Sequence, residues 1–432
     1  MAEHEEYPDA TSIWNERYSK GDLACTQASV KGDPIDYTQH PYLYALSTAR
    51  RVTGDLRGDP LLDVAGKFLG TPAKRMLSVG SGLGFAEEKL VRHGLVESVV
   101  AFEASPVAVK NALKRLETAG LRERFDFRSG DVCSADLQDD EFDLVFVQAA
   151  IHHFYNIDEM FELFRRVLKP GGMIIYDEYV GPDHHMYEDS VMALLNEVND
   201  CLAAGYRYDV LRNEIRSEVP RASLEWMLNM DPSEGVHSSK ILPLTYRHFD
   251  VQDRRDYGGT LMRPFFVGIL PNFDFDDPKD QTVAALIVKI EEILIRYGVM
   301  PSYHSIVVGK LRDEVLELSD SDLERINYSN WSGFGRHGQL TVPAEIAVFS
   351  PANHTDGNWL RGIGILGEAT LFLPSSEKAV NAIRMGLNIH FEDGTVRLVK
   401  EVRRNAGSLV VSCSGEPLDP RAVGFPKKFF VK

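Results

Sequence analysis

Between residues 71 and 182, short apolar runs alternate with stretches in which apolar side chains recur every three or four positions. The short runs predict strands, and the stretches with a helical period predict helices. The expected order is strand 76–80, helix 85–93, strand 98–103, helix 106–119, strand 124–128, strand 142–148, helix 157–168 and strand 172–180. Elements that alternate in this way are typical of an α/β fold, with a parallel sheet covered by helices on both faces.

A glycine-rich turn follows the first of these strands. Residues 76–84 read Met-Leu-Ser-Val-Gly-Ser-Gly-Leu-Gly, and the next strand ends on Glu103. Glycine at positions 80, 82 and 84 lets the backbone take positive φ and approach a ligand, and the helix that follows offers free N–H groups. A carboxylate at the end of the neighbouring strand can accept hydrogen bonds from a ribose diol. The sequence therefore predicts a nucleotide-like ligand at this corner.

Composition narrows the class of protein. The chain has 432 residues, with 44% hydrophobic and 26% charged side chains, and a formal net charge of −17. This length predicts about two or three domains, and the acidic balance disfavours nucleic acid and anionic membranes as partners. We find no apolar run near the ~18 residues of a membrane span and no signal peptide, so we expect a cytoplasmic protein. The scattered cysteines predict neither a zinc site nor a disulfide framework.

The motifs of this region resemble, in order, those of the class I S-adenosylmethionine-dependent methyltransferases. The stretches that carry the resemblance are 79–84, 99–103, 128–132, 142–153 and, most distinctively, 166–173, Arg-Val-Leu-Lys-Pro-Gly-Gly-Met. The resemblance covers about residues 10–310. It implies a seven-stranded Rossmann-like sheet whose last strands lie near 247–254 and 302–308, with a helix at 279–297 between them.

The same resemblance implies S-adenosyl-L-methionine as the cofactor and gives roles to particular residues. Gly80, Ser81 and Gly82 would lie beside its methionine portion, and Glu103, with Ala104 next to it, on the ribose hydroxyls. The adenine amine would meet Asp131 with Val132 beside it, and Gln148 would lie under the sulfonium.

One position departs from the family. Ser78 stands where the family often has an acid, so Tyr18, Trp14 or a water would have to take the place of that carboxylate, or the cofactor binds more weakly. A dinucleotide fingerprint would instead require glycine at position 85, which is Phe85. The motif therefore favours a methyltransferase over a dehydrogenase.

Methyl transfer requires a nucleophile in line with the methyl group, and a hydroxyl acceptor also requires a base. The candidates near the strand ends are His152, His153 and Glu178, then His184 and His185. Histidine is the natural base near neutral pH, although one of the 152/153 pair can equally serve in packing. Glu178, His184 and His185, together with Asp177 and Asp183, could also hold a divalent ion. A solvated acidic loop is the simpler interpretation of these residues, so we predict no metal.

The pattern divides the chain into regions: an N-terminal cap at 1–70, the methyltransferase domain at 71–310 with a lid insertion at 183–245 over the acceptor pocket, a linker at 311–345, and a C-terminal β-sandwich at 346–432. Loop signals at 231–235 and 257–260 are candidates for substrate contact or ordinary turns. In the last region, two-residue alternation predicts strands at 382–391, 395–403, 408–414 and 427–431, with hairpin turns at 392–394 and 405–407.

The added β-domain suggests the class of acceptor. Modules of this shape bind glycans or pair subunits, so by analogy we expect O-methylation of a sugar or glycan-linked small molecule, and homo-oligomers formed through this domain. Two alternatives stay open. One is N- or C-methylation of a secondary metabolite, and the other is a non-catalytic methyltransferase-like scaffold, for which Ser78 is the warning sign.

Overall fold

The computed structural model describes residues 11–19, 36–319, 322, 323 and 326, and the backbone of strands within 359–431. The chain forms two compact units, residues 1–331 and 332–432. No helix in the described ranges is long and apolar enough to cross a bilayer.

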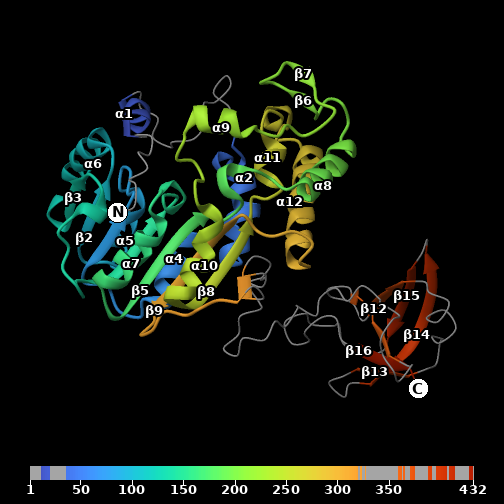
Figure 1. Ribbon diagram of the computed structural model, residues 1–432. Coiled ribbons are helices and arrows are strands. Elements are labelled where there is room, and N and C mark those ends of the chain that lie inside the picture. Colours follow the sequence, from blue (N-terminus) through green and yellow to red (C-terminus); the bar gives the residue numbers. More distant parts are fainter. Residues whose placement is uncertain are drawn as a thin grey trace. The chain divides into compact units, whose positions relative to one another are not determined.

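The first unit is built on a seven-stranded sheet of order β3-β2-β1-β4-β5-β9-β8 (Figure 1). Its strands are β1 (Met76–Val79), β2 (Val99–Glu103), β3 (Phe125–Ser129), β4 (Phe142–Gln148), β5 (Leu168–Tyr179), β8 (Phe249–Gly258) and β9 (His304–Leu311). The first five pair in parallel, and β9 runs antiparallel to both neighbours. Strand order reverses between β1 and β4, so the predicted mostly parallel sheet is confirmed, with its ligand-binding edge at these two strands.

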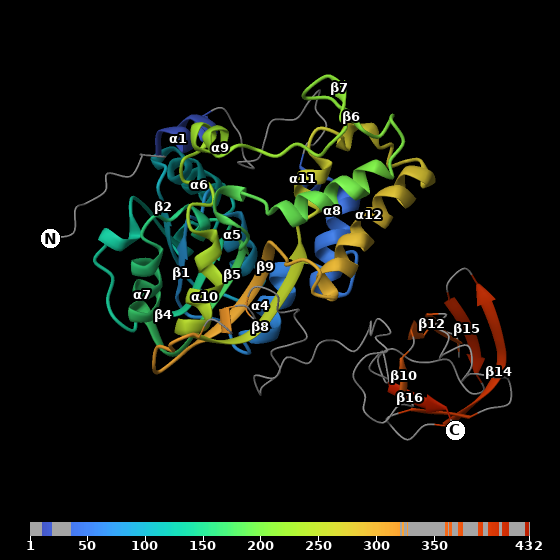
Figure 2. The same ribbon diagram turned by 45° about the vertical axis from the view of Figure 1, so that its right-hand side comes forward.

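Helices cover both faces of the sheet, as Figure 2 shows. One face carries α4 (Pro60–Phe68), α5 (Phe85–Arg92) and α6 (Pro106–Thr118), and the other carries α7 (Ile157–Val167) and α10 (Ser238–His248). Successive strand side chains point to opposite faces, so Val99 packs with the first group and Val100 with the second.

The predicted boundaries agree within one residue from β1 to α7 and differ more for the last three strands. Strand β8, predicted at 247–254, spans Phe249–Gly258, and β9, predicted at 302–308, spans His304–Leu311. At β5 the difference lies at the start. The strand begins at Leu168, which pairs with Phe142, whereas it was predicted to begin at 172. Between this pair and the next, Leu144 with Met173, the register shifts, so the Pro-Gly-Gly segment bulges out within the strand. The turn thus interrupts the pairing with β4 without ending the strand.

A third apolar cluster lies outside the two sheet faces. It joins α8 (Asp189–Asp200), α11 (Met262–Phe266) and α12 (Pro278–Arg296) to the segment around Tyr37 and Leu43. A buried ion pair of 2.7 Å between Arg51 and Glu291 fastens α12 to α3 (Arg50–Thr53). The remaining short elements are α1 (Thr11–Ser19), η1 (Tyr37–Gln39), α2 (Pro41–Tyr44), η2 (Ala45–Ala49), η3 (Arg122–Arg124), η4 (Val132–Ser134), η5 (Ile151–His153), η6 (Asp183–His185), β6 (Tyr208–Asp209), β7 (Glu214–Ile215), α9 (Leu224–Met230) and η7 (Leu270–Asn272).

The region 183–245, predicted as a lid, has two parts. Residues from η6 to α9 lie outside the two sheet faces, whereas α10 packs on the sheet beside α7 and belongs to the main core. The predicted helix at 279–297 is present as α12, which contacts β8 and packs with α11.

The second unit contains strands β10 (Trp359–Arg361), β11 (Ile363–Gly364), β12 (Thr370–Pro374), β13 (Asn388–Phe391), β14 (Val396–Asn405), β15 (Ser408–Cys413) and β16 (Lys428–Val431). They pair antiparallel in the order β10-β16-β13-β14-β15-β12-β11. All four predicted strands overlap observed ones, while the turn residues 392–394, 406 and 407 and most of the linker lie outside the described residues. The β-sandwich stays a prediction.

Candidate active site

The glycine turn and Glu103 meet at the carboxyl end of β1 and β2. Gly80, Gly82 and Gly84 all have positive φ, between 53° and 71°. The N–H of Gly82 donates to Oε2 of Glu103 at 2.8 Å, and the N–H of Ser105 donates to Oε1 at 2.9 Å. Burial raises the pKa of Glu103, and these two hydrogen bonds oppose that rise. The acid predicted at the end of the neighbouring strand is therefore fixed against the turn, with lone pairs left on both oxygens.

Helix α1 closes over this corner. Tyr18 is buried with Leu83 and Ala108, and a Cβ at position 82 would approach the Tyr18 hydroxyl to 2.9 Å. The Ser105 hydroxyl donates to Asn15 at 2.6 Å and ties α1 to the start of α6. Only glycine fits this point of the turn, and the predicted cofactor residue Tyr18 lies directly above it.

A buried acid on another element contacts Ser78. Ser78 donates to Oε1 of Glu87 at 2.6 Å, and Glu87 is 3% exposed on the inner side of α5. Its Oε2 has no hydrogen-bond partner among the described residues. Burial raises the pKa of Glu87 to about 7. Sequence reasoning missed this residue, although a glutamate three positions before Leu90, on the apolar face of α5, was a readable signal.

The other predicted cofactor residues lie along the same edge. The backbone N–H of Gly130 donates to the carbonyl of Glu103 at 3.1 Å, which holds the ends of β2 and β3 together. Asp131 caps η4 by accepting from the N–H of Cys133 at 3.0 Å, with Val132 buried behind it. At the end of β4, the Gln148 amide donates to Asp177 at 3.2 Å. Burial raises the pKa of Asp177 to about 6.

Beyond β4 and β5, Glu178 holds the loop that carries the histidine pair. Its Oε1 accepts from the N–H groups of Ala150 and Ile151, the latter at 2.6 Å. Its Oε2 accepts from the N–H of Tyr179 at 2.9 Å and lies 2.5 Å from Nδ1 of His152. Burial lowers the pKa of His152, but the charge and hydrogen bond of Glu178 outweigh burial and the pKa is raised. The contact places the proton of His152 on Nδ1 and leaves Nε2 facing away from Glu178.

A second carboxylate, Glu234, faces both histidines. Its Oε1 lies 3.8 Å from Nε2 of His152 and 2.8 Å from Nε2 of His185, and its Oε2 lies 3.9 Å from Nε2 of His153. Burial lowers the pKa values of His153 and His185 to about 4, with neighbouring cationic groups adding to the effect. We call His152, His153, Glu178, His185 and Glu234 the His–Glu cluster.

The cluster differs from the predicted set in two ways. His184 lies beside it, but its Nδ1 is 3.0 Å from the backbone carbonyl of Glu234, so the ring is held by the main chain. Glu234 itself was not predicted as a site residue, although the loop signal at 231–235 marked its segment. Of the predicted base candidates, His152, His153 and Glu178 come together as expected from their positions at the strand ends.

Backbone strain accompanies the cluster. Ala149, His184 and His185 have φ between 50° and 55°, in the left-handed region that such residues seldom adopt. Strain of this kind is held by surrounding contacts and gathers at functional sites. Here the loop after β4 is fastened by the Ala149 N–H, which donates to the carbonyl of Asp177 at 2.8 Å, and by Glu178.

Helix α1 joins the glycine corner to the His–Glu cluster. The Trp14 ring meets the His153 ring edge-on, with centroids 5.0 Å apart, and Arg17 lies 3.7 Å from Asp231. Four residues on, Tyr18 covers Gly82. One turn of helix therefore contacts both halves of the site.

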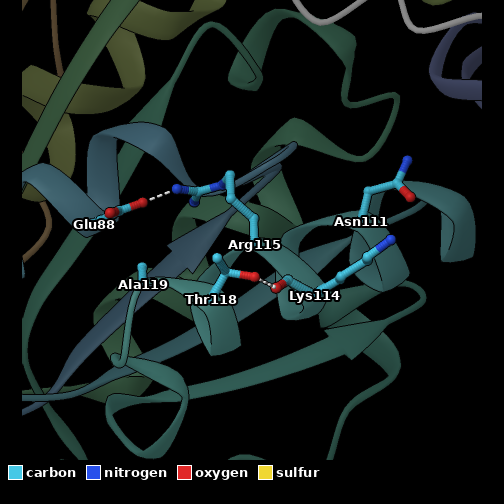
Figure 3. Close-up of a pocket in the computed structure, with 6 residues that line it drawn as sticks. All are labelled: Glu88, Asn111, Lys114, Arg115, Thr118 and Ala119. Atoms are coloured by element: carbon cyan, nitrogen blue, oxygen red, sulfur yellow. Dashed lines mark hydrogen bonds and ion pairs between the residues drawn. The ribbon is translucent and has the colours of Figure 1, made fainter.

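A separate surface hollow lies between α5 and α6, and Figure 3 shows its lining. Arg115 pairs there with Glu88 and also donates to the carbonyls of Leu83 and Gly84, at 2.8 and 3.1 Å. The hollow thus lies next to the glycine turn, on the side of α6. Arg115, which lines it, stabilises the turn through these two hydrogen bonds. We assign no ligand to it.

Comparisons with known proteins identify the domain. Residues 77–176 match a family model described as a methyltransferase domain. A sterol 24-C-methyltransferase of Gibberella zeae is 26% identical over 141 residues, covering 32% of this chain and 37% of that protein. Phosphoethanolamine N-methyltransferase 1 of Arabidopsis thaliana is 29% identical over 112 residues, covering 25% of this chain and 21% of that protein. The chain thus matches well under half the length of these relatives.

Among solved structures, phosphoethanolamine N-methyltransferase 2 of Haemonchus contortus, in complex with S-adenosyl-L-methionine, aligns with a TM-score of 0.34 at 18% identity, covering 69% of this chain and 60% of that one. The family match spans the sheet from β1 to β5, the region that contains the glycine turn, Glu103 and the histidine pair. The match identifies a methyltransferase domain in this part of the chain, which also holds the motifs that resemble the class I S-adenosylmethionine-dependent methyltransferases, a family whose cofactor is S-adenosylmethionine.

Proposed function

We propose that this protein transfers a methyl group from S-adenosylmethionine to an oxygen nucleophile. The observation that carries the proposal is the Gly82–Glu103 hydrogen bond at a corner that α1 joins to the His–Glu cluster. A cofactor corner and a proton-accepting cluster then share one covering helix, which supports a single site in which both reactants can be held for in-line transfer.

The residues at the corner fit the cofactor chemically. Its ribose diol suits the buried Glu103 carboxylate, and its adenine amine suits Asp131. The turn lacks side chains where Gly82 passes under Tyr18, so the backbone can approach the methionine portion. When bound, the cofactor supplies a methyl group on a positively charged sulfur.

Glu87 answers the departure at Ser78. We assign to this carboxylate the place that the family's strand acid often takes, near the cofactor's ammonium group. The support is its 2.6 Å hydrogen bond from Ser78 and its buried oxygen without a partner among the described residues. A nearby cation would favour the ionised form of Glu87 and repay part of its burial.

On the acceptor side, His152 is the best-placed base of the cluster. Glu178 holds the proton on Nδ1, so Nε2 can take the proton of an acceptor hydroxyl while the oxygen attacks the methyl carbon and the carbon–sulfur bond breaks. His153 and His185 have pKa values lowered to about 4, so they stay neutral near pH 7 and line the site without added charge. We assign positioning of His152 to Glu178, and His184 a supporting place at the rim.

The chemical class of the acceptor is a further part of the proposal. A sugar or glycan-linked acceptor rests on analogy with the C-terminal β-domain, and pairing of subunits through that domain is proposed on the same ground. The second candidate, N- or C-methylation, is favoured by the relatives, which are named as a carbon and a nitrogen methyltransferase. A hydroxyl acceptor is favoured by the oriented His152, because a free amine can attack without a base of this kind.

The cofactor half is tested by calorimetry with S-adenosylmethionine on the full chain. We expect binding, and we expect Glu103→Ala and Gly82→Val to weaken it at least tenfold. Gly66→Val is the matched control, because a Cβ at this helical glycine meets no atom within 4 Å. Absence of binding, or equal binding by all variants, would overturn the proposal and favour a non-catalytic scaffold.

The acceptor half is tested with radiolabelled methyl groups. Sugars and glycans, phosphoethanolamine and a sterol are offered in parallel, with and without residues 332–432. Transfer to a hydroxyl that falls with His152→Ala supports the oxygen proposal. Transfer only to nitrogen or carbon replaces it with the second candidate, and glycan turnover unchanged by the deletion removes the proposed glycan role of the β-domain.

A further inference from the structure

We propose that His152, His153 and Glu234 bind a divalent transition-metal ion of the zinc class at the carboxyl ends of β4 and β5. The inference deepens the proposed function, on which it rests for what the ion does to the acceptor. Binding of the ion itself rests on the geometry of the cluster alone.

The donor atoms already converge. One ligand atom from each of the three residues lies within 4.8 Å of the others, and the two imidazole-to-carboxylate distances are 3.8 and 3.9 Å. Bonds of about 2.0–2.1 Å to nitrogen and oxygen place tetrahedral ligand atoms about 3.4 Å apart. The two distances reach different oxygens of Glu234, so the donor atoms must draw together by about 0.5 to 1.5 Å on binding an ion. Two imidazoles and one carboxylate form a donor set suited to zinc, iron(II) or cobalt(II) more than to magnesium or calcium.

The hydrogen bonds behind the histidines set their tautomers for metal binding. An ionised Glu178 can only accept, so His152 carries its proton on Nδ1. Ser233 donates its one hydroxyl proton to Asp231 at 2.7 Å, so it accepts from Nδ1 of His153 at 3.0 Å. Both Nε2 lone pairs are then free and lie on the side of Glu234. Carboxylate or hydroxyl partners on the second ring nitrogen are the usual support of metal-binding histidines.

The third ligand is oriented as well. Nε2 of His185 lies 2.8 Å from Oε1 of Glu234, which fixes the carboxylate and leaves Oε2 toward His153. Arg263 lies 4.0 Å from the same Oε1. The three carboxylates Glu178, Asp231 and Glu234 outnumber the two arginines that lie beside them, Arg17 and Arg263, and a cation would offset this difference.

Three protein ligands leave open positions on the ion. An acceptor hydroxyl bound there loses its proton to water more readily, because the cation stabilises the resulting oxyanion, which then attacks the methyl carbon. When the ion is bound, His152 is a metal ligand and cannot act as a free base. It acts as a base only in the metal-free protein. The edge contact of Trp14 with His153 keeps the ion site next to the helix that covers the cofactor corner.

The test uses the full chain freed of metal with a chelator and titrated with Co²⁺, whose visible absorption reports its coordination. We expect one ion per chain and four- or five-coordinate bands. Glu234→Gln and His153→Ala should each weaken Co²⁺ binding about 100-fold, whereas the matched control His237→Ala, on the neighbouring helix end, should bind as the wild type does. Affinity for S-adenosylmethionine is measured on the same samples to show that each variant is folded.

The outcomes separate the two proposals. No cobalt binding, or binding undiminished in both cluster variants, overturns the metal site even if the cofactor binds normally. Cobalt binding lost in the cluster variants alone supports the site even if methyl transfer is never found. Loss of cobalt and cofactor binding together in Glu234→Gln would show a folding defect, and in that case His153→Ala decides.

Discussion

Replacing Glu87 by glutamine tests whether a buried acid at the glycine turn weakens the fold when it ionises. The side chain is 3% exposed, accepts from Ser78 at 2.6 Å and has one oxygen without a partner among the described residues. Glutamine keeps the size of the side chain and an acceptor oxygen for Ser78, but it cannot ionise. The variant therefore removes the charge with little change in packing.

The magnitude follows from the pKa. Burial is the largest cause and raises the pKa of Glu87 from 4.5 to about 7. Because the folded-state pKa lies above the unfolded-state value, the folded protein holds the proton more tightly. Its contribution to stability is complete below about pH 4.5 and is lost as the pH rises through about 7. A difference of about 2.5 pKa units at 1.36 kcal/mol each gives about 3 kcal/mol.

We expect the free energy of unfolding of Glu87→Gln, relative to wild type, to rise by about 3 kcal/mol between about pH 4 and pH 8 and then to level off. Urea unfolding followed by tryptophan fluorescence at a series of pH values measures it. The neighbouring Glu88→Gln, whose glutamate lies toward the surface and pairs with Arg115 and Arg92, is the control and should show no comparable trend. A flat difference between Glu87→Gln and wild type, or the same slope in the control, would refute the reasoning.

Three further predictions concern particular contacts. Gly82→Ala places a Cβ 2.9 Å from the Tyr18 hydroxyl at a φ of +53°, so calorimetry should show weaker S-adenosylmethionine binding. If the clash with the hydroxyl outweighs the backbone strain, adding Tyr18→Phe should restore part of the affinity; no restoration would assign the loss to the backbone. Glu178→Ala leaves the buried N–H groups of the loop after β4 without their acceptor, so denaturation should show a loss of about 3 kcal/mol or more, and an unchanged midpoint would contradict the assigned contacts. Arg51→Met leaves buried Glu291 without its cationic partner and should cost about 3–5 kcal/mol, a loss that Arg51→Lys should reduce.

The sequence determined the local elements of the first unit. The spacing of apolar residues and the residue types of the turns predicted the strands around the glycine turn. Strand β4 has the predicted bounds, 142–148. Ser105 followed by Pro106 starts α6 by capping, an interaction within one turn of chain. Such features depend on neighbours a few positions away, so the sequence carries them directly. The position of Glu103 at the strand end also followed, because carboxyl ends of parallel strands share one edge.

Only the tertiary structure decided which distant side chains meet. Glu87 comes to Ser78 because α5 folds back over β1, and Glu234 comes to His152 and His153 because the loop before α10 packs over the ends of β4 and β5. These meetings join residues up to 82 positions apart, from His152 to Glu234, and they depend on how helices pack and where loops cross. A sequence pattern records which face of an element is buried, but not which partner that face finds.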